Sequence, residues 1–452
     1  MTQHQVKPRI EAEQTMLIGG EWLPAASGDT IETFDPATRQ PIARVASGGR
    51  EDLDRAVQHA ERGLPEWRRR SPRERAAVLQ EAIARIEAHA DELAYLEALN
   101  SGNPYSAMFG DIGHAADSVR YKCGVALELK GETIPVRGDV LDYTVREPYG
   151  VVARINPFNH PLMFALMKIA SPLIAGNAVI LKPSSINPLG PLAAAHLVAD
   201  LFPAGVLNVL TGGGDTLGAA IARHPAIRRI GFTGGLEAGL AVSQAAAEGG
   251  IKSLSFELGG KNPLIVFQDG DFDGAVESAV NGMNLTKTLG QSCASTSRVF
   301  VHRSLHDDLV AAIASRFEEL RMGMPVDPDT ELGCLVSDTQ LRKVKGYVES
   351  GLRDGAKLVT GGSAPQDPPF SDGSFYPPTL FVQVRHGMTI SREEIFGPVL
   401  SVLSWDDEED LLRQANDVAY GLTAIVWTND VRRAHRVAAQ LEAGSVAVNP
   451  VG

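Results

Sequence analysis

Cys293 is the residue of this chain whose type and setting most favour chemistry. It ends the run Gly-Gln-Ser-Cys, between a predicted helix and a predicted strand that starts at Arg298. At such a junction the neighbouring N–H groups point at a bound substrate, and a thiol with a lowered pKa is a nucleophile. The alternative is a small buried side chain, which is what we predict for Cys123 and Cys334.

A carboxylate and an amide follow other predicted strands. Glu257 lies at the end of an otherwise apolar strand, in the run Phe-Glu-Leu-Gly-Gly-Lys-Asn-Pro. Its carboxylate is either desolvated, which raises its pKa towards that of a useful general base, or held as structure by the glycine amides. Asn159 lies in the proline-restricted run Ile-Asn-Pro-Phe-Asn-His-Pro. Its amide either donates to a developing oxyanion or forms a turn.

A glycine-rich segment at residues 211–218 follows a predicted strand and opens a helix, as phosphate-binding loops do. It departs from Gly-x-Gly-x-x-Gly because Leu217 stands at the last glycine position, so a flexible turn is the alternative. Gly260 and Lys261 are followed by Asn262, which lacks the hydroxyl of a Walker motif and disfavours a nucleotide hydrolase. No His-Glu-x-x-His, Cys-x-x-Cys or Gly-x-Ser-x-Gly run occurs, so neither a metal site nor a serine hydrolase is predicted.

Short apolar runs that alternate with helix-length segments surround these residues. This alternation predicts parallel strands joined by right-handed helical crossovers, and hence an α/β fold. Ligands of such sheets bind beyond the carboxyl ends of the strands, so the loops after the strands are the place for a site. The predicted buried strands are residues 151–155, 178–181, 206–210, 229–232 and 253–258.

The remaining chain supplies scaffold and a second lobe. Residues 1–100 predict a short β-rich entry followed by helices, one of which begins with a capping box at Ser71 and Glu74. Alternating apolar residues predict a two-stranded excursion over residues 127–147, whose expected role is a subunit interface. A second α/β set follows. Its predicted elements are the strands 264–267, 398–403 and 424–427 and the helices 273–283 and 306–321.

Composition and charge exclude several classes of protein. The chain has 452 residues, 44% hydrophobic and 21% charged, which is typical of a globular protein with more than one domain. A net charge of -13 disfavours nucleic acid and anionic membranes as partners, because both require a concentrated basic surface. The basic run Arg68–Arg70 is predicted to be a solvated face. A polar N-terminus and three cysteines without disulfide spacing predict a cytoplasmic protein.

Taken together and in this order, the motifs resemble those of the aldehyde dehydrogenase superfamily, from about Gly19 to Asn449. The resemblance implies a parallel-sheet, Rossmann-like dinucleotide-binding domain (1–126 and 149–258), a β-hairpin oligomerisation element (127–148) and a second α/β catalytic domain (259–452). The motifs are Asn-Pro-Phe-Asn-His-Pro (156–161), Gly-Asn-Ala-Val-Ile-Leu-Lys-Pro (176–183), Phe-Thr-Gly (232–234), Phe-Glu-Leu-Gly-Gly-Lys (256–261), Gly-Gln-Ser-Cys (290–293) and Glu-Glu-Ile-Phe-Gly-Pro (393–398).

The resemblance implies oxidation of an aldehyde to a carboxylic acid with NAD or NADP. Cys293 is then the nucleophile that forms a thiohemiacetal and a thioester. The amide of Asn159 and the backbone N–H of Cys293 hold the oxyanion, a role worth about 3 kcal/mol per donor. Glu257 activates the water that hydrolyses the thioester, which argues against relatives that transfer the acyl group to coenzyme A. Lys168 is implied as a further catalytic residue.

A cofactor site is also implied. Lys182 matches the ribose-binding lysine, and the segment 234–239 matches the pyrophosphate turn. Glu394 and Phe396 match contacts around the nicotinamide ribose. Close packing near the adenosine is implied for Gly212, Gly214 and Gly218. The other implied cofactor contacts are Ile155, Asn156, Phe158, Ser184, Ser185, Phe232, Thr233, Gly234, Gly235, Gly239 and Leu258.

Two positions depart from the family pattern at this cofactor site. Ser185 stands where many relatives carry glutamate, whose charge repels a 2′-phosphate, so tolerance of NADP beside NAD is expected. Gly235 replaces a serine that often follows Phe-Thr-Gly. Because this removes one hydroxyl donor to the pyrophosphate, somewhat weaker cofactor binding is expected.

The chain ends at Gly452, whereas relatives continue for several tens of residues beyond the strand at 446–449. We therefore expect altered assembly or exposed edges, with reduced activity, in what is otherwise a homodimer or homotetramer. The alternative function is a catalytically weak or silent family member that acts as a dinucleotide-binding or structural protein. The substrate is expected to be a small aromatic or medium aliphatic aldehyde. Side chains expected along its entry are His160, Met163, Phe164 and Met167.

Overall fold

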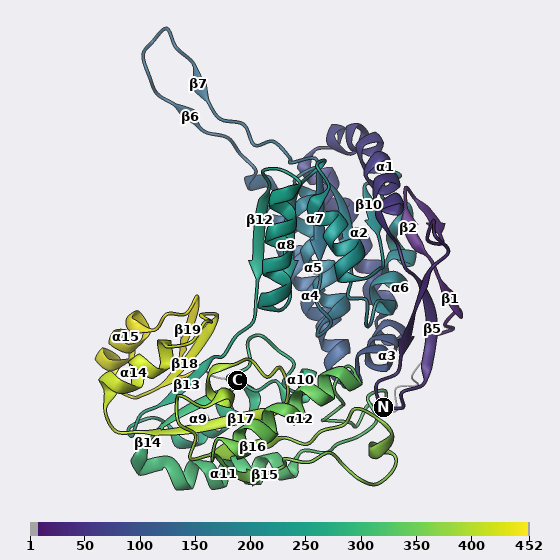
Figure 1. Ribbon diagram of the computed structural model, residues 1–452. Helices are drawn as coiled ribbons and strands as arrows, with labels where there is room; N and C mark the ends of the chain where they lie inside the picture. Colours follow the sequence, from purple (N-terminus) through teal and green to yellow (C-terminus); the bar gives the residue numbers. More distant parts are fainter. Residues whose placement is uncertain (1–7, 451–452) are drawn as a thin grey trace. The chain divides into compact units, whose positions relative to one another are not determined.

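The computed structural model describes residues 8–450, and the chain divides into two compact units (Figure 1). Each unit contains a seven-stranded, mostly parallel sheet, which confirms the predicted α/β fold. In the part of the chain that the structure describes, no helix is both long and apolar enough to cross a bilayer. The first unit comprises Met1–Phe34, Pro41–Asn100 and Met108–Glu257, and the second comprises Asp35–Gln40, Ser101–Ala107 and Leu258–Gly452.

The sheet of the first unit has the strand order β12-β11-β8-β9-β10-β2-β3. The first five strands in this order are parallel, and they are the five that the sequence predicts. Two short strands of the N-terminal entry extend the other edge in antiparallel pairing. The bounds are β2 Met16–Ile18, β3 Glu21–Leu23, β8 Val151–Ile155, β9 Ala178–Lys182, β10 Leu207–Val209, β11 Ile227–Thr233 and β12 Ser253–Glu257.

The predicted burial is correct for β9 and β10 and for all but one residue of β8, only partly correct for β11, and wrong for β12. Every residue of β9 and β10 is buried, because helices and neighbouring strands cover them on all sides. In β12 four residues are half-buried and the last is exposed. The reason is its place at the sheet edge, where β11 is its one strand partner. An apolar run therefore predicted the strand but not its position in the sheet.

The strand register places the functional candidates of the first unit at the carboxyl ends of its parallel strands. Ile155 at the end of β8 pairs with Lys182 at the end of β9, and Thr233 of β11 pairs with Glu257 of β12. The chain runs from β8 to β9 and β10 in one direction, and β11 returns to the other side of β8. The strand order thus reverses between β8 and β11, and crevices at such switch points bind ligands in open α/β sheets.

Helices cover this sheet, and one of them begins where the sequence predicts. The helix α2 starts with Pro72 and has the predicted capping box, in which Ser71 and Glu74 exchange side-chain to backbone hydrogen bonds of 2.7 and 3.3 Å. A small separate sheet has the order β1-β5-β4. The bounds are β1 Glu13–Gln14, β4 Thr30–Phe34, β5 Pro41–Ala46, α1 Arg50–Arg69, α2 Pro72–Ala88, α3 Ala90–Ser101, α4 Tyr105–Val125, η1 Ala126–Glu128, α5 Pro161–Ile174, α6 Leu189–Val198, η2 Ala199–Leu201, η3 Gly214–Gly218, α7 Ala219–Arg223 and α8 Leu236–Glu248.

The predicted excursion is a long hairpin that extends away from the helices of the first unit (Figure 1). Its strands are β6 Thr133–Ile134 and β7 Asp142–Tyr143, paired antiparallel. The apolar side chains of this hairpin are exposed, among them Val136, Leu141 and Val145. Exposed apolar side chains on a marginal hairpin are typical of a surface that another chain covers. The subunit interface itself stays a prediction.

The second unit has a sheet in the order β15-β16-β17-β14-β13-β18-β19, in which β15 alone is antiparallel to its neighbour. Its central strands are buried on both faces, and the predicted strands and helices of this part of the chain are all present. The bounds are β13 Pro263–Val266, α9 Phe272–Asn281, α10 Leu285–Thr288, β14 Arg298–His302, η4 Arg303–Leu305, α11 His306–Glu319, α12 Asp338–Arg353, β15 Lys357–Thr360, η5 Phe370–Asp372, β16 Thr379–Val382, α13 Thr389–Arg392, β17 Val399–Trp405, α14 Glu408–Asn416, β18 Thr423–Trp427, α15 Val431–Gln440 and β19 Ser445–Val448.

Candidate active site

Asn159 lies in the loop that joins β8 to α5, at the switch point of the first sheet. The side chain is 4% exposed, so the loop holds a polar amide inside the protein. The start of the loop is tied to the next strand, because the N–H of Asn156 donates to the carbonyl of Lys182 at 3.0 Å. Farther along, Asn187 donates from its side chain to the carbonyl of Phe158 at 2.7 Å. The loop is therefore fixed at two points around Asn159.

Glu257 ends the edge strand β12, and its side chain is exposed. Its backbone carbonyl accepts a hydrogen bond of 3.1 Å from Gly234, which joins the end of β12 to the start of α8. The sequence left two alternatives for the carboxylate, desolvation or capture by glycine amides. Its exposure does not fit desolvation within the first unit. One of those glycine amides, that of Gly260, donates instead to Glu394.

Lys182 is buried at the end of β9, with 4% of its surface exposed. Burial lowers the pKa of its ammonium group to about 8, while the negative charge of Asp215 acts in the opposite direction. Its Nζ donates to the carbonyl of Pro183 at 3.2 Å. A lysine held in this way can donate further hydrogen bonds to a ligand at the strand end, because its ammonium group has three N–H donors.

The glycine-rich segment lies beside Lys182. It forms the single turn η3, which passes directly into α7. A Cβ atom on Gly218 would be 3.9 Å from the Cε atom of Lys182, and one on Gly212 would be 2.7 Å from the carbonyl oxygen of Gly48. Gly212 also has φ of +157°, which side chains rarely adopt. These glycines therefore permit close backbone packing around the lysine.

The segment after β11 forms the start of the 13-residue helix α8. Gly235 is the N-cap and provides no side-chain hydrogen bond to the first turn. The N–H of Gly239 already donates to the carbonyl of Gly235 at 3.0 Å, which leaves the preceding N–H groups of the turn for a ligand. A helix N-terminus with unused N–H groups is a site for an anion such as a phosphate.

In the second unit, Cys293 lies in the loop between α10 and β14 and is partly exposed. The side-chain amide of Asn262 donates to the carbonyl oxygens of Cys293 and Ser295, at 2.8 and 2.9 Å. Gly260 passes so close that a Cβ atom there would collide with the carbonyl oxygen of Cys293. The segment before β13 thus holds the thiol-bearing loop in place.

The same segment also contacts the glutamate predicted near the nicotinamide ribose. The N–H of Gly260 donates to Oε1 of Glu394 at 2.9 Å, and burial raises the pKa of this carboxyl. Phe396 has a left-handed backbone with φ of 60°, and its carbonyl accepts a hydrogen bond of 2.6 Å from Gln340. Within the second unit, the structure therefore brings Cys293 and Glu394 to the two sides of one glycine-rich segment.

Lys168 lies about two turns into α5, away from the loop that carries Asn159. Its Nζ is 5.6 Å from the centre of the Phe164 ring, a cation–π contact. Its charge also contributes, after burial, to lowering the pKa of Lys122. Lys168 therefore belongs to the helix that follows the Asn159 loop and not to the loop itself.

Two contacts of the site are not predicted from the sequence. Asn262 binds the Cys293 loop and also accepts from the N–H of Thr423 at 3.1 Å. Its place directly after Gly-Gly-Lys, five residues beyond Glu257, was the available signal. His160, the N-cap of α5, contacts Asp111 of α4 with 2.6 Å between Nδ1 and Oδ2. No local pattern predicts that pair, because 49 positions separate the two residues. In residues 8–450, no group of three or more His, Cys, Asp or Glu side chains is arranged to hold a metal ion.

Comparison with known proteins identifies the family of this chain. The model of the aldehyde dehydrogenase family matches residues 22–451. Aldehyde dehydrogenase from Bacillus cereus in complex with NAD+ is 39% identical, with a TM-score of 0.93 over 97% of this chain and 89% of that chain. A putative aldehyde dehydrogenase from Burkholderia cenocepacia is 37% identical, with a TM-score of 0.94 and coverages of 97% and 90%. Betaine aldehyde dehydrogenase from Staphylococcus aureus with NAD+ is 33% identical, with a TM-score of 0.93 and coverages of 97% and 88%.

Proposed function

The chain belongs to the aldehyde dehydrogenase family and is an NAD(P)-dependent enzyme that oxidises aldehydes, and we propose that it acts through a covalent thioester on Cys293. The observation that supports this nucleophile is the contrast among the three thiols. Cys123 and Cys334 are 5% and 0% exposed, and burial raises the pKa of each. Cys293 is partly exposed in a loop held by Asn262. It is therefore the thiol that an aldehyde can reach.

In the proposed first step, the sulfur of Cys293 attacks the aldehyde carbon and forms a thiohemiacetal. The negative charge that develops on the aldehyde oxygen needs hydrogen-bond donors. The side-chain amide of Asn159 and the N–H of Cys293 are the proposed donors. Burial of Asn159 supports this role, because a donor shielded from water stabilises developing charge more strongly.

The cofactor supplies a hydride acceptor when it is bound, so that the thiohemiacetal carbon is oxidised to a thioester. Several residues fit a dinucleotide. Buried Lys182 would hold a ribose, and the uncapped N-terminus of α8 after Gly235 would hold the pyrophosphate. Glu394, fixed by Gly260, would bind the second ribose. Half-buried Ser185 adds no negative charge, which supports acceptance of NADP beside NAD.

Glu257 is the proposed base for the second half of the reaction. Its carboxylate takes a proton from water as the water attacks the thioester carbon, and the carbon–sulfur bond then breaks to release the carboxylic acid and free Cys293. The exposure of the Glu257 side chain supports this role, because an exposed carboxylate can reach a water molecule. Lys168 is proposed only as a positive charge on α5, in keeping with its half-buried position.

The decisive test measures NADH and NADPH formation from a panel of aldehydes. Cys293→Ala is expected to abolish turnover, whereas Cys123→Ala, which removes a buried thiol, keeps it. Glu257→Gln is expected to allow one burst of reduced cofactor, equal to the enzyme concentration, and then to stall at the thioester. The family match does not favour the alternative function, a catalytically silent member that binds a dinucleotide. Wild-type protein that binds the cofactor but oxidises no aldehyde would support that alternative.

The proposed substrate is a small aromatic or medium aliphatic aldehyde. The α5 face next to Asn159 supports this choice, because it combines the apolar Met163, Phe164 and Met167 with one polar group, His160. The ring of Phe164 packs edge-on against His160 at 5.8 Å. A comparison of benzaldehyde, hexanal and glyceraldehyde tests this choice, because a preference for glyceraldehyde would contradict it.

Assembly, domain roles and location complete the proposal. We propose a homodimer or homotetramer formed through the hairpin 127–148, whose apolar side chains are exposed. The first unit is the proposed dinucleotide-binding domain and the second the proposed catalytic domain. The cytoplasm is the proposed compartment, because Cys293 must stay reduced to act. Sedimentation of Leu141→Asp and Val145→Asp variants tests the assembly, since both are expected to be smaller than wild type.

A further inference from the structure

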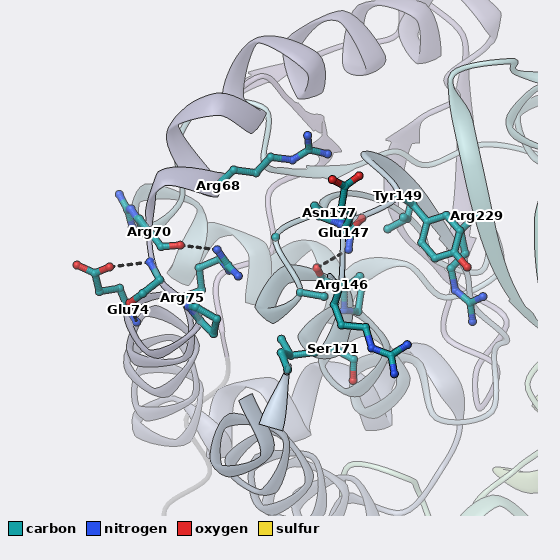
Figure 2. Close-up of a pocket in the computed structure, with 18 of the residues that line it drawn as sticks. Arg68, Arg70, Glu74, Arg75, Arg146, Glu147, Tyr149, Ser171, Asn177 and Arg229 are labelled. Carbon is teal, nitrogen blue, oxygen red and sulfur yellow. Dashed lines mark hydrogen bonds between the residues drawn. The ribbon is translucent and has the colours of Figure 1, made fainter. Parts of the chain in front are cut away.

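A cavity of the first unit lies near the starts of β8 and β9, at the end of the sheet opposite to the carboxyl ends of these strands. Its volume is about 800 Å³, and its lining includes seven arginines, two glutamates and no lysine, aspartate or histidine. Figure 2 shows Arg68, Arg75, Arg146 and Arg229 on different sides of this hollow. They come from α1, α2, the base of the hairpin and β11. In a chain with a net charge of -13, this concentration of positive charge is unusual.

The predicted solvated face at Arg68–Arg70 therefore forms part of a cavity wall. That wall has two glutamates against seven arginines, so its net charge is positive. Glu74 is used by the capping box of α2, where it accepts from the N–H of Ser71 at 2.7 Å. Arg75 donates from Nε to the carbonyl of Ile174 at 2.7 Å and from Nη1 to the carbonyl of Arg70. These carbonyl partners position the guanidinium of Arg75, and Glu74 is the nearby negative charge that acts on it.

Among the cavity arginines, Arg154 has the surroundings that most favour a bound anion. It projects from β8 beside Gly231 of β11, its register partner. A Cβ atom on Gly231 would collide with Nη1 of Arg154, so the glycine leaves room for the guanidinium. The Nε of Arg154 is buried and has no hydrogen-bond partner among the described residues. Burial and the charge of Arg229 lower the pKa of Arg154 to about 10. Arg154 as a whole is half-buried, and a partly desolvated cation of this kind is stabilised when an anion accompanies it.

Arg229 is held in place on the opposite wall. Its guanidinium donates to the hydroxyls of Ser253 and Ser255 at 2.6 and 3.4 Å and lies 5.6 Å from the centre of the Tyr149 ring. These contacts are all with neutral groups. They fix the guanidinium in advance, which reduces the entropy lost when a ligand binds.

We propose that this arginine-lined cavity is a binding site for a small multivalent anion that carries two or more phosphate or carboxylate groups. The planar guanidinium group binds both oxygens of such a group at once. The volume of about 800 Å³ is in the range of small-molecule sites and exceeds the space that one phosphate fills. The cavity lies away from the strand ends that carry Asn159 and Lys182, so the ligand is distinct from cofactor and substrate.

Calorimetric titration of pyrophosphate and of citrate into the enzyme tests the proposal. The buffer has low ionic strength and contains saturating NAD+, which blocks the cofactor's own pyrophosphate site. One site per chain is expected, and affinity is expected to fall steeply as NaCl is added. Inorganic phosphate, with one group, is expected to bind at least about tenfold more weakly. Binding of pyrophosphate alone assigns a phosphate ligand, and binding of citrate alone assigns a carboxylate ligand.

A charge-matched pair of double variants locates the site. Arg68→Gln with Arg146→Gln removes two exposed cavity arginines that make no hydrogen bond or ion pair with other residues between 8 and 450. Pyrophosphate affinity is expected to fall at least about tenfold. Arg44→Gln with Arg62→Gln makes the same charge change at exposed positions outside the cavity, and an effect below about twofold is expected. Equal losses in both pairs, or no binding by wild type, would overturn the proposal.

Arg154→Gln separates a ligand-binding arginine from a structural one. If Arg154 binds an anion, Arg154→Gln is expected to melt at a higher temperature than wild type in anion-free buffer, because the variant no longer carries the desolvated charge of Arg154. Pyrophosphate then raises the melting temperature of wild type but not that of the variant. A variant that melts lower than wild type and keeps its response to pyrophosphate would show that Arg154 only supports the fold.

Discussion

The side-chain amide of Asn262 donates to the backbone carbonyl of Cys293 at 2.8 Å, although the two residues are 31 positions apart. Asn262 directly precedes β13, and the Cys293 loop directly precedes its parallel neighbour β14. The same side chain also binds Ser295 and Thr423, so its two N–H groups and its oxygen are all used. The thiol of the proposed mechanism is thus positioned by a fully satisfied buried amide.

Replacement of Asn262 is therefore expected to displace the thiol. Asn262→Ala leaves the carbonyl groups of Cys293 and Ser295 without their donor, and kcat/KM for aldehydes is expected to fall about 100-fold. The rate at which iodoacetamide alkylates Cys293 is expected to change in parallel. Asn281→Ala, on the exposed end of α9, is the control and should match wild type. A folded Asn262→Ala enzyme with wild-type kcat/KM would refute the positioning role.

Ser185→Glu is expected to turn the cofactor preference towards NAD. A carboxylate at this position, three residues after Lys182, would repel the 2′-phosphate of NADP but not the 2′-hydroxyl of NAD. The KM for NADP is expected to rise about tenfold or more, with the KM for NAD nearly unchanged. Ser185→Gln introduces a side chain of about the size of glutamate without its charge, and it serves as the control. Equal changes of both KM values in Ser185→Glu would contradict an electrostatic cause.

Asp111→Asn is expected to weaken aldehyde binding through His160. The contact of 2.6 Å between Asp111 Oδ2 and His160 Nδ1 fixes the imidazole ring at the start of α5. A hydrogen bond to a charged group contributes about 1.5–3 kcal/mol, so its loss is expected to raise the KM for aldehydes about tenfold while the KM for NAD stays constant. Asp117→Asn on the exposed face of α4 is the control. Steady-state kinetics that show no change in the aldehyde KM would rule out this role for His160.

Lys261→Met is expected to stabilise the protein at neutral pH. Lys261 is 1% exposed, its Nζ has no partner among the described residues, and burial lowers its pKa from 10.5 to about 7, with Arg298 adding to the effect. Between these two values the lysine binds a proton only in the unfolded chain. The free energy of unfolding of wild type therefore rises with pH there, by up to about 1.4 kcal/mol per pH unit.

Urea unfolding at pH 7.5, 8.5 and 9.5 measures this effect. The Lys261→Met variant has no titrating group at this position. The amount by which its free energy of unfolding exceeds that of wild type is therefore expected to shrink as the pH rises through this window. Lys345→Met changes an exposed lysine of α12 and should give the same stability difference at each pH. An advantage of Lys261→Met that stays constant with pH would mean that packing, and not titration, is the cause.

Local patterns were sufficient to predict much of this protein. The apolar runs of β8, β9 and β11 and the capping box at Ser71 depend on residues within a few positions of one another, so the sequence alone determines them. The same holds for the place of Cys293 between a helix and a strand. These elements also identify the loops after the strands, which is why Asn159 could be proposed before the fold was known, whereas Lys182 was proposed from the family resemblance.

The tertiary structure decided which of these elements are neighbours. Only the strand order shows that β12 is an edge strand and that β8 and β11 flank the switch point. Only packing between distant segments joins Asn262 to Cys293, and only the pairing of β8 with β11 places Arg154 beside Gly231. Hydrogen bonds between strands and contacts between buried side chains form across long stretches of chain. Their partners are chosen by the packing of the whole unit and leave no periodic signal in the sequence.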